Sequence, residues 1–383
     1  MISFDEAVAL IAEAARPLGR ETVPLDEAHG RVLAGHMRAR RDAPSADVSA
    51  MDGYAVREAD LPGRLRVAGE SFPGRGFAGT MHAGECVRIF TGAPLPPGAG
   101  RVVIQEDVSR EGEFAGFAAP AGEARHIRRR GSDFAARDLL LEPGRRLDAR
   151  ALVVVAAADI GEVEVFRRPL VALLATGDEL VEPGEGGGLP DSVSPGVAAL
   201  LADWGGEVSA RRRLRDDPGE MRRAAGEPAD LLVVTGGASV GERDFARAMF
   251  DGLDLIFSKV AIKPGKPAWL GRAGGRLVIG LPGNPTSAMV TARLLLAPLL
   301  AGLTGRAPAE ALRWRSAPLA EGLGPCGDRE TFVRARYDGE TARPLRNQDS
   351  GAQKMLADAD LLIRRRLGAP AAAKGEVVEI LDF

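Results

Sequence analysis

Apolar runs alternate with stretches of helical spacing in the second half of the chain. The runs at 170–175, 231–234 and 277–281 are short and rich in Leu and Val, as buried strands are. Between and after these runs, apolar residues recur at helical spacing at 195–204, 217–225, 242–250 and 285–300. This alternation predicts a doubly wound, mostly parallel α/β domain with helices on both faces of its sheet.

The rest of the chain has a different pattern. Short strand-like pieces cut by Pro and Gly fill 60–125, which predicts a small β-rich module, and alternating segments after Gly305 predict a C-terminal β domain. Helical stretches at 3–16, which opens with a Ser3–Glu6 capping box, and at 148–159 flank the β module. The predicted division is a split helical and linker domain (1–44 and 138–168), an inserted β-rich domain (45–137), an α/β domain (169–304) and a C-terminal domain (305–383).

Composition narrows the class of protein. The 383 residues are 45% hydrophobic and 27% charged, with a net charge of −3, which indicates a soluble multidomain protein and disfavours nucleic-acid binding. The apolar run at 149–160 is too short to span a membrane. Two cysteines without a CxxC pair fit a reducing compartment, so we expect a cytoplasmic protein without membrane contact.

Acidic residues follow three of the predicted strands. Glu179, Asp216 and Asp244 each lie in a loop at the carboxyl edge of the sheet, where α/β proteins bind ligands. One such acid alone is more often a helix cap or a solvated turn. Three on one edge, with no His or Cys, favour a hard cation such as Mg²⁺ held together with a substrate phosphate.

Two further segments favour an anionic ligand at this edge. The run TGGASVGERD at 235–244 places glycines before a helix, where backbone N–H groups can face a phosphate, although a tight turn explains it equally well. The chain has only five lysines, yet Lys259, Lys263 and Lys266 lie within eight residues. A solvated basic turn is the alternative, but Lys as a point charge suits an oxyanion. The stiff turn at 281–287 is placed to shape the same pocket.

The β-rich part offers weaker signals. Asp52-Gly53 read alone is a turn. The arginine run at 126–133, which ends at Asp133, either attracts an oligoanion or is a solvated strip. The four histidines all lie outside the α/β domain, so a Ser-His-Asp triad there is excluded.

Taken in order, these segments resemble the molybdopterin molybdenumtransferase family, the MoeA and gephyrin E-domain group. The matching segments are SAMDGYAV (49–56), RIFTGAPLPP (88–97), IRRRGSD (127–133), ATGDEL (175–180), RDDP (215–218), TGGASVGERD (235–244), KVAIKPGKP (259–267) and GLPGNPTS (280–287). The resemblance implies an elongated four-part subunit with a C-terminal β barrel, assembled as a homodimer. It also implies Mg²⁺-dependent hydrolysis of adenylylated molybdopterin, which releases AMP, with insertion of molybdate into the dithiolene.

The resemblance also implies roles for individual residues. Glu179, Asp216 and Asp244 become the acidic, metal-binding set, and Asp52 and Asp133 become catalytic acids of the inserted domain. The residues expected to bind the pterin phosphate and molybdate are Thr176, Gly236, Gly237, Ser239, Lys259, Lys263, Lys266, Pro282, Pro285, Ser287, Arg329 and Ser350. The implied partners are a second copy that shares each active site and, transiently, molybdopterin adenylyltransferase.

The chain also departs from the family pattern. Val193 stands where the family commonly has Asn, which leaves a specialised paralogue as one alternative. A molybdopterin adenylyltransferase and a gephyrin-like scaffold are two competing functions. The roughly 250 residues beyond an α/β domain of ~150 disfavour the adenylyltransferase, and the lysine and carboxylate set disfavours a pure scaffold.

Overall fold

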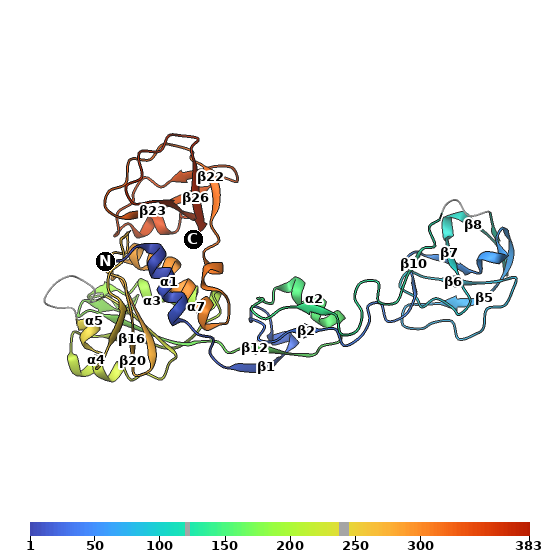
Figure 1. The fold of residues 1–383 in the computed structure, drawn as a ribbon, viewed down its shortest axis with the longest axis horizontal. Helices are drawn as coiled ribbons and strands as arrows, with labels where there is room; N and C mark the ends of the chain where they lie inside the picture. Colours follow the sequence, from blue (N-terminus) through green and yellow to red (C-terminus); the bar gives the residue numbers. More distant parts are fainter. Residues whose placement is uncertain (119–122, 237–244) are drawn as a thin grey trace.

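The computed structural model describes residues 1–118, 123–236 and 245–383 of an elongated molecule. Figure 1 shows a body at one end that holds both chain termini, a slender middle domain, and a separate β domain at the far end. The chain therefore forms an α/β multidomain fold in which distant parts are joined by narrow connections.

A six-stranded mixed sheet forms the centre of the body, in the order β16-β13-β17-β21-β20-β18. Its strands are β13 (Leu170–Thr176), β16 (Glu207–Leu214), β17 (Leu231–Thr235), β18 (Asp254–Phe257), β20 (Trp269–Ala273) and β21 (Arg276–Leu281). Strands β16, β13, β17 and β21 are parallel, as the alternation predicts. Strands β20 and β18 add an antiparallel edge that the apolar pattern did not indicate.

Both faces of this sheet are covered by helices. Along β13, Val171 and Leu173 belong to one hydrophobic core, while Ala172 and Leu174 belong to another, because successive side chains point to opposite faces. The helices are α3 (Val193–Asp203), α4 (Pro218–Ala224), α5 (Phe245–Ala248), α6 (Pro285–Thr291) and α7 (Ala297–Leu303), with a π-helical turn, Ala292–Leu296, between the last two. Residues of α3, α6 and α7 join the first core, and residues of α4 and α5 join the second.

The N-terminal helix α1 (Phe4–Ala14) belongs to the body. Its predicted capping box is present, with the Ser3 hydroxyl accepting a hydrogen bond from the Glu6 amide at 3.1 Å. Phe4 and Ile11 lie in the core that also contains Leu300 of α7. Helix α2 (Ala149–Ala157) instead packs in a separate core of the middle domain. The two helical stretches therefore do not share a core. Amphipathic spacing predicts that a helix buries one face, but it does not predict which other element that face packs against.

In and next to the middle domain, the segment that leads to the far domain pairs with the segment that returns from it, in three antiparallel strand pairs. They are β1 (Arg20–Pro24) with β12 (Glu162–Phe166), β2 (Met37–Arg38) with β11 (Leu139–Leu141), and β3 (Val48–Ser49) with β10 (Ile127–Arg128). Between the last two strands lies the far domain, a sheet in the order β7-β4-β6-β5-β9-β8. Its strands are β4 (Gly53–Val56), β5 (Gly63–Ser71), β6 (Glu85–Ile89), β7 (Arg101–Ile104), β8 (Val108–Glu111) and β9 (Phe114–Phe117). In sequence, the strands of the far domain therefore all lie between β3 and β10.

The C-terminal segment forms another sheet on the body. Its strands are β22 (Arg315–Pro318), β23 (Glu330–Tyr337), β24 (Ala342–Pro344), β25 (Leu361–Arg365) and β26 (Val377–Asp382). Strand β19 (Ile262–Lys263), which comes from the α/β part of the chain, pairs in parallel with β23. This pairing fixes the lysine-containing segment against the C-terminal sheet. A short pair of strands, β14 (Leu180–Val181) and β15 (Leu189–Pro190), stands beside the central sheet.

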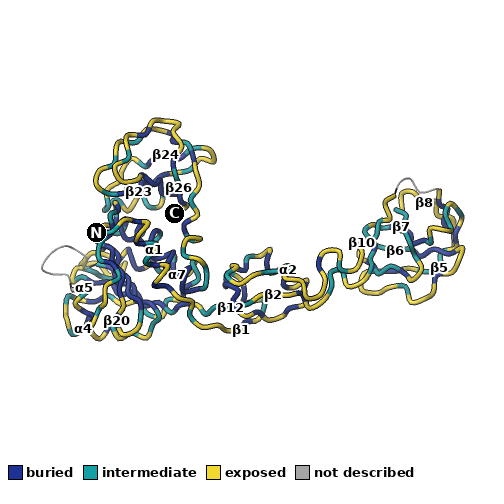
Figure 2. Tube along the Cα trace, viewed as in Figure 1, coloured by how far each residue is buried: buried dark blue, intermediate teal, exposed yellow. Residues whose placement is uncertain are grey.

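Burial is concentrated in the body (Figure 2). Within the described part of the chain, the helical stretch Pro285–Leu303 is long and apolar enough to cross a membrane, but 89% of it is buried inside the protein. It is longer than the apolar run at 149–160 that stood out in the sequence, and its burial is that of a core helix.

Candidate functional site

A cavity of about 430 Å³ opens at the carboxyl ends of the parallel strands. Thr176 at the end of β13, Thr235 at the end of β17 and Pro282 after β21 line it. Pro285, at the start of α6, lines it as well. This is the edge at which an α/β sheet binds ligands, as the sequence predicts.

The floor of this cavity is made of closely packed backbone. The Thr176 hydroxyl donates a hydrogen bond to the Thr235 carbonyl oxygen at 3.3 Å. Gly236 has φ 87°, and a Cβ there would overlap the Thr176 carbonyl oxygen and lie 2.9 Å from its Oγ1. A Cβ on Gly283 would come within 3.2 Å of the Gly236 Cα. Glycine is required at 236 because other residues rarely adopt this φ and because no side chain fits.

Of the two predicted metal-binding acids that the structure describes, Glu179 lines this cavity and Asp216 does not. Glu179 is exposed at its wall. Asp216 lies in the neighbouring loop, where its amide donates to Asp178 Oδ1 at 3.0 Å, but it is not a lining residue. Asp244 lies outside the described residues, as do Gly237 and Ser239. Within residues 1–118, 123–236 and 245–383, no three His, Cys, Asp or Glu side chains come together to hold a metal. The metal site thus stays a prediction.

A second cavity, of about 840 Å³, adjoins the first and shares Pro267, Pro282 and Asn284 with it. It lies between the lysine segment, the start of α6 and the C-terminal sheet. Six predicted ligand-binding residues line it: Lys263, Lys266, Pro282, Ser287, Arg329 and Ser350. The structure therefore brings together residues that are up to 87 positions apart in sequence, from 263 to 350.

The lysine segment is held in place by packing around Gly265. This residue has φ 114°, and a Cβ there would lie 2.9 Å from Ile262 Cδ1. Gly265 is buried, whereas Lys263 and Lys266 on either side of it are exposed and line the cavity. Lys259 lines neither cavity. Two of the three clustered lysines are thus directed to the candidate site.

The opposite wall depends on Asn284 and Arg334, two residues that were not among the predicted ligand-binding residues. Asn284 Nδ2 donates to Ser350 Oγ at 3.2 Å, which ties α6 to the C-terminal domain. Arg334 is fully buried, and its Nη2 donates to the Asp349 carbonyl oxygen at 3.1 Å. Burial lowers the pKa of the Arg334 guanidinium. Asn284 is part of the LPGNP motif, but nothing in the sequence marks Arg334, which follows the pattern of a strand.

Asp52 of the inserted domain is oriented by one neighbour. Its Oδ1 accepts hydrogen bonds from the Thr91 amide at 2.7 Å and from the Thr91 hydroxyl at 2.8 Å. These bonds, together with the charge of Arg88, lower the pKa of the Asp52 carboxyl. Thr91 was not among the predicted site residues, although it is the Thr of the TGAP motif and that motif is a signal by which it can be found.

Asp133 does not lie beside Asp52. Ile127 pairs with Ser49 in an antiparallel register, and the amide of Asp133 donates to the Ala43 carbonyl oxygen at 3.0 Å. The chain therefore carries Asp52 and Asp133 to opposite ends of this pairing. Asp52 precedes β4 and lies in the far domain, whereas Asp133 follows β10 and adjoins Phe134, which belongs to the core of the middle domain. Neither acid lines the two cavities of the body.

Comparison with known proteins gives matches along the whole chain. Family models match in order: MoeA N-terminal region (domain I and II) at 2–159, probable molybdopterin binding domain at 172–302, and MoeA C-terminal region (domain IV) at 316–383. A molybdopterin molybdenumtransferase of Haemophilus influenzae is 38% identical over 329 residues, which is 83% of this chain and 80% of the relative. One of Synechococcus elongatus is 34% identical over 403 residues, 99% of each chain.

The fold is also similar to that of solved structures over the whole chain. A solved structure of the molybdopterin biosynthesis MoeA protein of Pyrococcus horikoshii OT3 has a TM-score of 0.86 at 26% identity and covers 100% of both chains. The match described as molybdopterin-binding, at 172–302, contains most of the residues that line the first cavity and the lysines of the second.

Proposed function

Because the chain belongs to the molybdopterin molybdenumtransferase family and so is an enzyme that inserts molybdenum in molybdenum cofactor biosynthesis, we propose that it acts on adenylylated molybdopterin. The proposed reaction is a Mg²⁺-dependent hydrolysis that releases AMP while molybdate enters the dithiolene. The observation that carries the proposal is the pair of adjoining cavities with Pro267, Pro282 and Asn284 in common. The adenylyltransferase and scaffold functions are not favoured by these relatives.

The two cavities suit the two parts of such a reaction. In the first, we assign Thr176, Gly236 and the neighbouring Gly237 and Ser239 to the phosphate, with Pro282 and Pro285 shaping the wall. In the second, we assign Lys263, Lys266 and Arg329 to the molybdate oxyanion. Ser287 and Ser350 add hydroxyl donors. Cationic donors around an oxyanion form strong, charge-assisted hydrogen bonds. Lys259 has no role in this assignment.

The donor set fits a hard cation. Glu179 offers a carboxylate at the first cavity, and Asp216 and Asp244 follow neighbouring strands. Mg²⁺ is usually held by one or two carboxylates together with substrate phosphate, so Glu179 beside a bound phosphate would be a suitable ligand. When bound, Mg²⁺ supplies charge neutralisation at the phosphate under attack. The role of the protein is to place the phosphate against Gly236 and the acids beside it.

The position of Asp52 and Asp133 supports shared active sites. Asp52 lies in the far domain, which the middle domain separates from the body (Figure 1), and Asp133 lies between β10 and the core of the middle domain. Neither acid lines a cavity of the body. We propose a homodimer in which the inserted domain of one copy faces the cavities of the other. Variants Asp52→Ala and Asp244→Asn, each inactive alone, should then regain activity in a mixed dimer, which contains one site with both acids. Verified mixed dimers without activity would show that each site is built within one copy.

The finer domain description is also a proposal. We assign 1–44 and 138–168 to the split domain, 45–137 to the inserted domain, 169–304 to the α/β domain and 305–383 to a β barrel, with α1 packed on the body. A cytoplasmic location and a transient contact with molybdopterin adenylyltransferase belong to the same proposal.

AMP release tests the metal assignment. The purified protein is incubated with adenylylated molybdopterin, with and without Mg²⁺, and AMP is measured by chromatography. We expect release by the parent only with Mg²⁺, and greatly reduced release by Glu179→Gln and Asp244→Asn. The control is Glu185→Gln, another acid of the same region that does not line the cavity. Equal release by parent and acid variants would contradict the metal role.

A further inference from the structure

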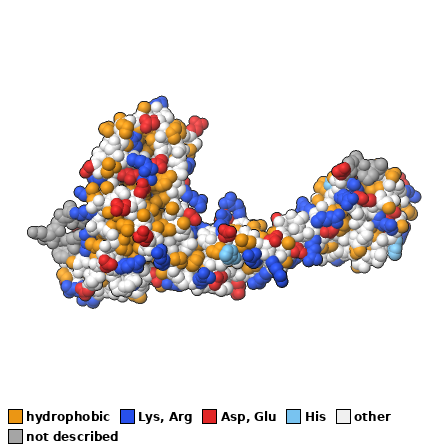
Figure 3. Space-filling model, in the orientation of Figure 1, with side chains coloured by type: hydrophobic (Ala, Val, Ile, Leu, Met, Phe, Trp, Pro, Cys, Tyr) orange, Lys and Arg blue, Asp and Glu red, His pale blue; other side chains and the backbone are white. Residues whose placement is uncertain are grey.

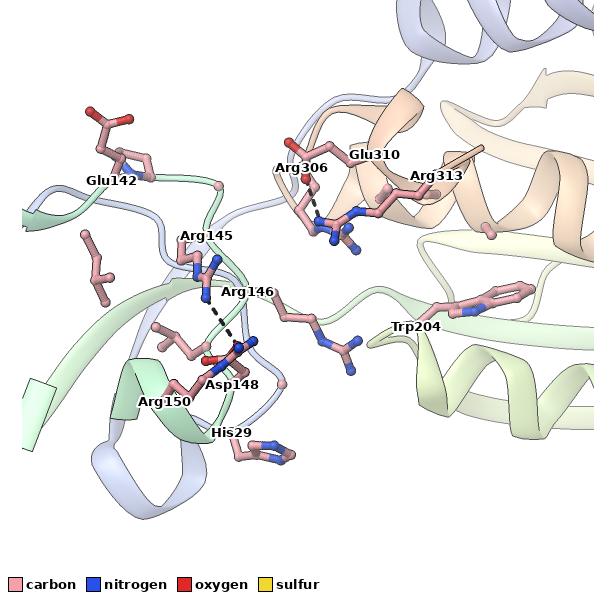
Figure 4. A pocket seen from close by; sticks show the side chains of 18 of the residues that line it. His29, Glu142, Arg145, Arg146, Asp148, Arg150, Trp204, Arg306, Glu310 and Arg313 are labelled. Atoms are coloured by element: carbon pink, nitrogen blue, oxygen red, sulfur yellow. Dashed lines mark hydrogen bonds and ion pairs between the residues drawn. The ribbon is translucent and has the colours of Figure 1, made fainter. Parts of the chain in front are cut away.

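A separate cleft of about 1010 Å³ lies between the middle domain and the body. One wall is formed by 140–148 with His29, and the other by Trp204, part of α7 and 306–313. Figure 4 shows the charged side chains of both walls. Six arginines line this arginine cleft: Arg145, Arg146, Arg150, Arg293, Arg306 and Arg313.

Four carboxylates also line the arginine cleft, and three of them are already engaged. Asp148 caps α2 and accepts a hydrogen bond from Arg150 at 2.8 Å; the Ala151 amide and Arg150 together lower the pKa of its carboxyl to about 2. Glu310 lies 3.5 Å from Arg306. Asp382 is paired with an arginine outside the cleft at 2.5 Å. Little negative charge is therefore left for the remaining arginines.

Three of the arginines have no carboxylate within ion-pair distance among the residues that the structure describes. Arg146 donates to the backbone carbonyl of Asp203 at 3.0 Å, across the cleft. Arg293 donates to two backbone carbonyls, at 2.7 and 2.8 Å. Arg313 has neither a hydrogen bond nor an ion pair within those residues. Positive charge thus accumulates on both walls.

The arginines also repel one another. Burial, together with the positive charges of Arg146 and Arg313, lowers the pKa of the Arg306 guanidinium. Burial lowers the pKa of Arg293 to about 10. In Figure 4, Arg146 extends from the middle domain toward Trp204, and Arg306 and Arg313 project from the facing wall. Lys and Arg side chains are frequent along this part of the surface (Figure 3). A multiply charged anion would relieve this repulsion.

We propose that the arginine cleft binds an oligophosphate, which bridges Arg146 of the middle domain to Arg306 and Arg313 of the body. The planar guanidinium fork suits phosphate oxygens, and three converging forks match more than one phosphate group. The cleft is larger than a single phosphate needs. An oligophosphate comes either free or as part of a nucleotide, whose base could stack on Trp204. The proposal does not depend on the reaction proposed above.

Binding to the full-length protein tests the proposal. Tripolyphosphate and ATP are titrated separately by calorimetry at low salt, with Lys266→Ala as the background so that oxyanion binding in the second cavity contributes less. Binding in the first cavity is common to the background protein and the cleft variants, so the difference between them reports the cleft. We expect binding that weakens as salt rises. We expect Arg313→Gln and Arg146→Gln, on opposite walls, each to weaken it about tenfold or more, as the loss of a charged hydrogen bond does. Tighter binding of ATP than of tripolyphosphate would identify a nucleotide.

Controls separate this site from general electrostatics and from assembly. Arg222→Gln, which removes an exposed arginine of α4, should leave the affinity unchanged. Absence of binding by the background protein, or equal affinities of the two cleft variants and the Arg222 variant, would overturn the proposal. It would also fail if the cleft variants changed the sedimentation coefficient from dimer to monomer without a change in affinity, because the cleft would then be an assembly surface.

Discussion

Replacement of Gly236 by Ala tests whether the floor of the first cavity is as closely packed as the structure indicates. The new Cβ would overlap the carbonyl oxygen of Thr176 and lie 2.9 Å from its Oγ1. Backbone atoms cannot rotate away as a flexible side chain does, so β13 or the loop after β17 must move. The residue would also be held at φ 87°, which disfavours any side chain.

The expected loss of stability has two parts. The left-handed backbone costs about 1–2 kcal/mol for an L-residue, and overpacking adds about 1–3 kcal/mol. The sum is about 2–5 kcal/mol. For a domain of 150–250 residues, 1 kcal/mol shifts Tm by about 2–4 °C. The Tm of the transition that includes the α/β domain should therefore fall by about 4 °C or more.

Thermal unfolding followed by circular dichroism measures this change against two matched glycines. Gly252 has φ 68° and no atom within 4 Å of its Cβ position, so Gly252→Ala carries only the backbone cost. Gly19 has open space and no positive φ, so Gly19→Ala should be close to neutral. The Tm is expected to decrease in the order Gly19→Ala, then Gly252→Ala, then Gly236→Ala. A Gly236→Ala variant as stable as Gly252→Ala would refute the close approach of the two backbones.

Three other predictions concern the ligand-binding residues. Lys266→Ala should weaken molybdate binding about tenfold, the lower end for a charged hydrogen bond at an exposed site, and Lys374→Ala should not; equal dissociation constants would support a solvated turn. Thr91→Ala removes one of the two hydrogen-bond donors that lower the pKa of Asp52, and we therefore expect the pKa of Asp52 to rise. The acid limb of the pH profile of AMP release should then move to higher pH. An unmoved limb would mean that ionised Asp52 is not required. Iodoacetamide should modify Cys326, which lines the second cavity, but not Cys86, because burial raises the pKa of the Cys86 thiol to about 12. Molybdate should slow the modification of Cys326. Labelling of Cys86, or modification of Cys326 at the same rate with molybdate, would contradict this prediction.

The sequence predicted the central elements well because they follow simple periodicity. The apolar runs of β13, β17 and β21 are buried on both faces, and such strands are recognisable from composition alone. Strand β18 was missed, since Asp254 and Leu255 are exposed and the strand has no alternating pattern. The packing of α1 against the body was also missed, because the sequence of an amphipathic helix does not show which surface the helix packs against.

Residues of the candidate site that belong to a sequence motif could be predicted, whereas residues that reach the site only through tertiary contacts could not. Lys263, Lys266 and Glu179 stood out by residue type and position, and all three line a cavity. Arg334, which holds the loop that carries Ser350, is recognised only from its burial and its bonds. Lys259, which the charge pattern also favoured, lines neither cavity, and its role as a ligand-binding residue stays a prediction.

We propose that one site both releases AMP and inserts molybdenum. The most direct measurement follows both products in the same incubation of the full-length protein with adenylylated molybdopterin, Mg²⁺ and molybdate. AMP is measured by chromatography, and protein- or pterin-bound molybdenum by mass spectrometry. We expect equal amounts of AMP and molybdenum-loaded pterin, and a parallel loss of both in Lys266→Ala. AMP release that proceeds in full without any molybdenum-loaded pterin, or molybdenum insertion without AMP release, would contradict it.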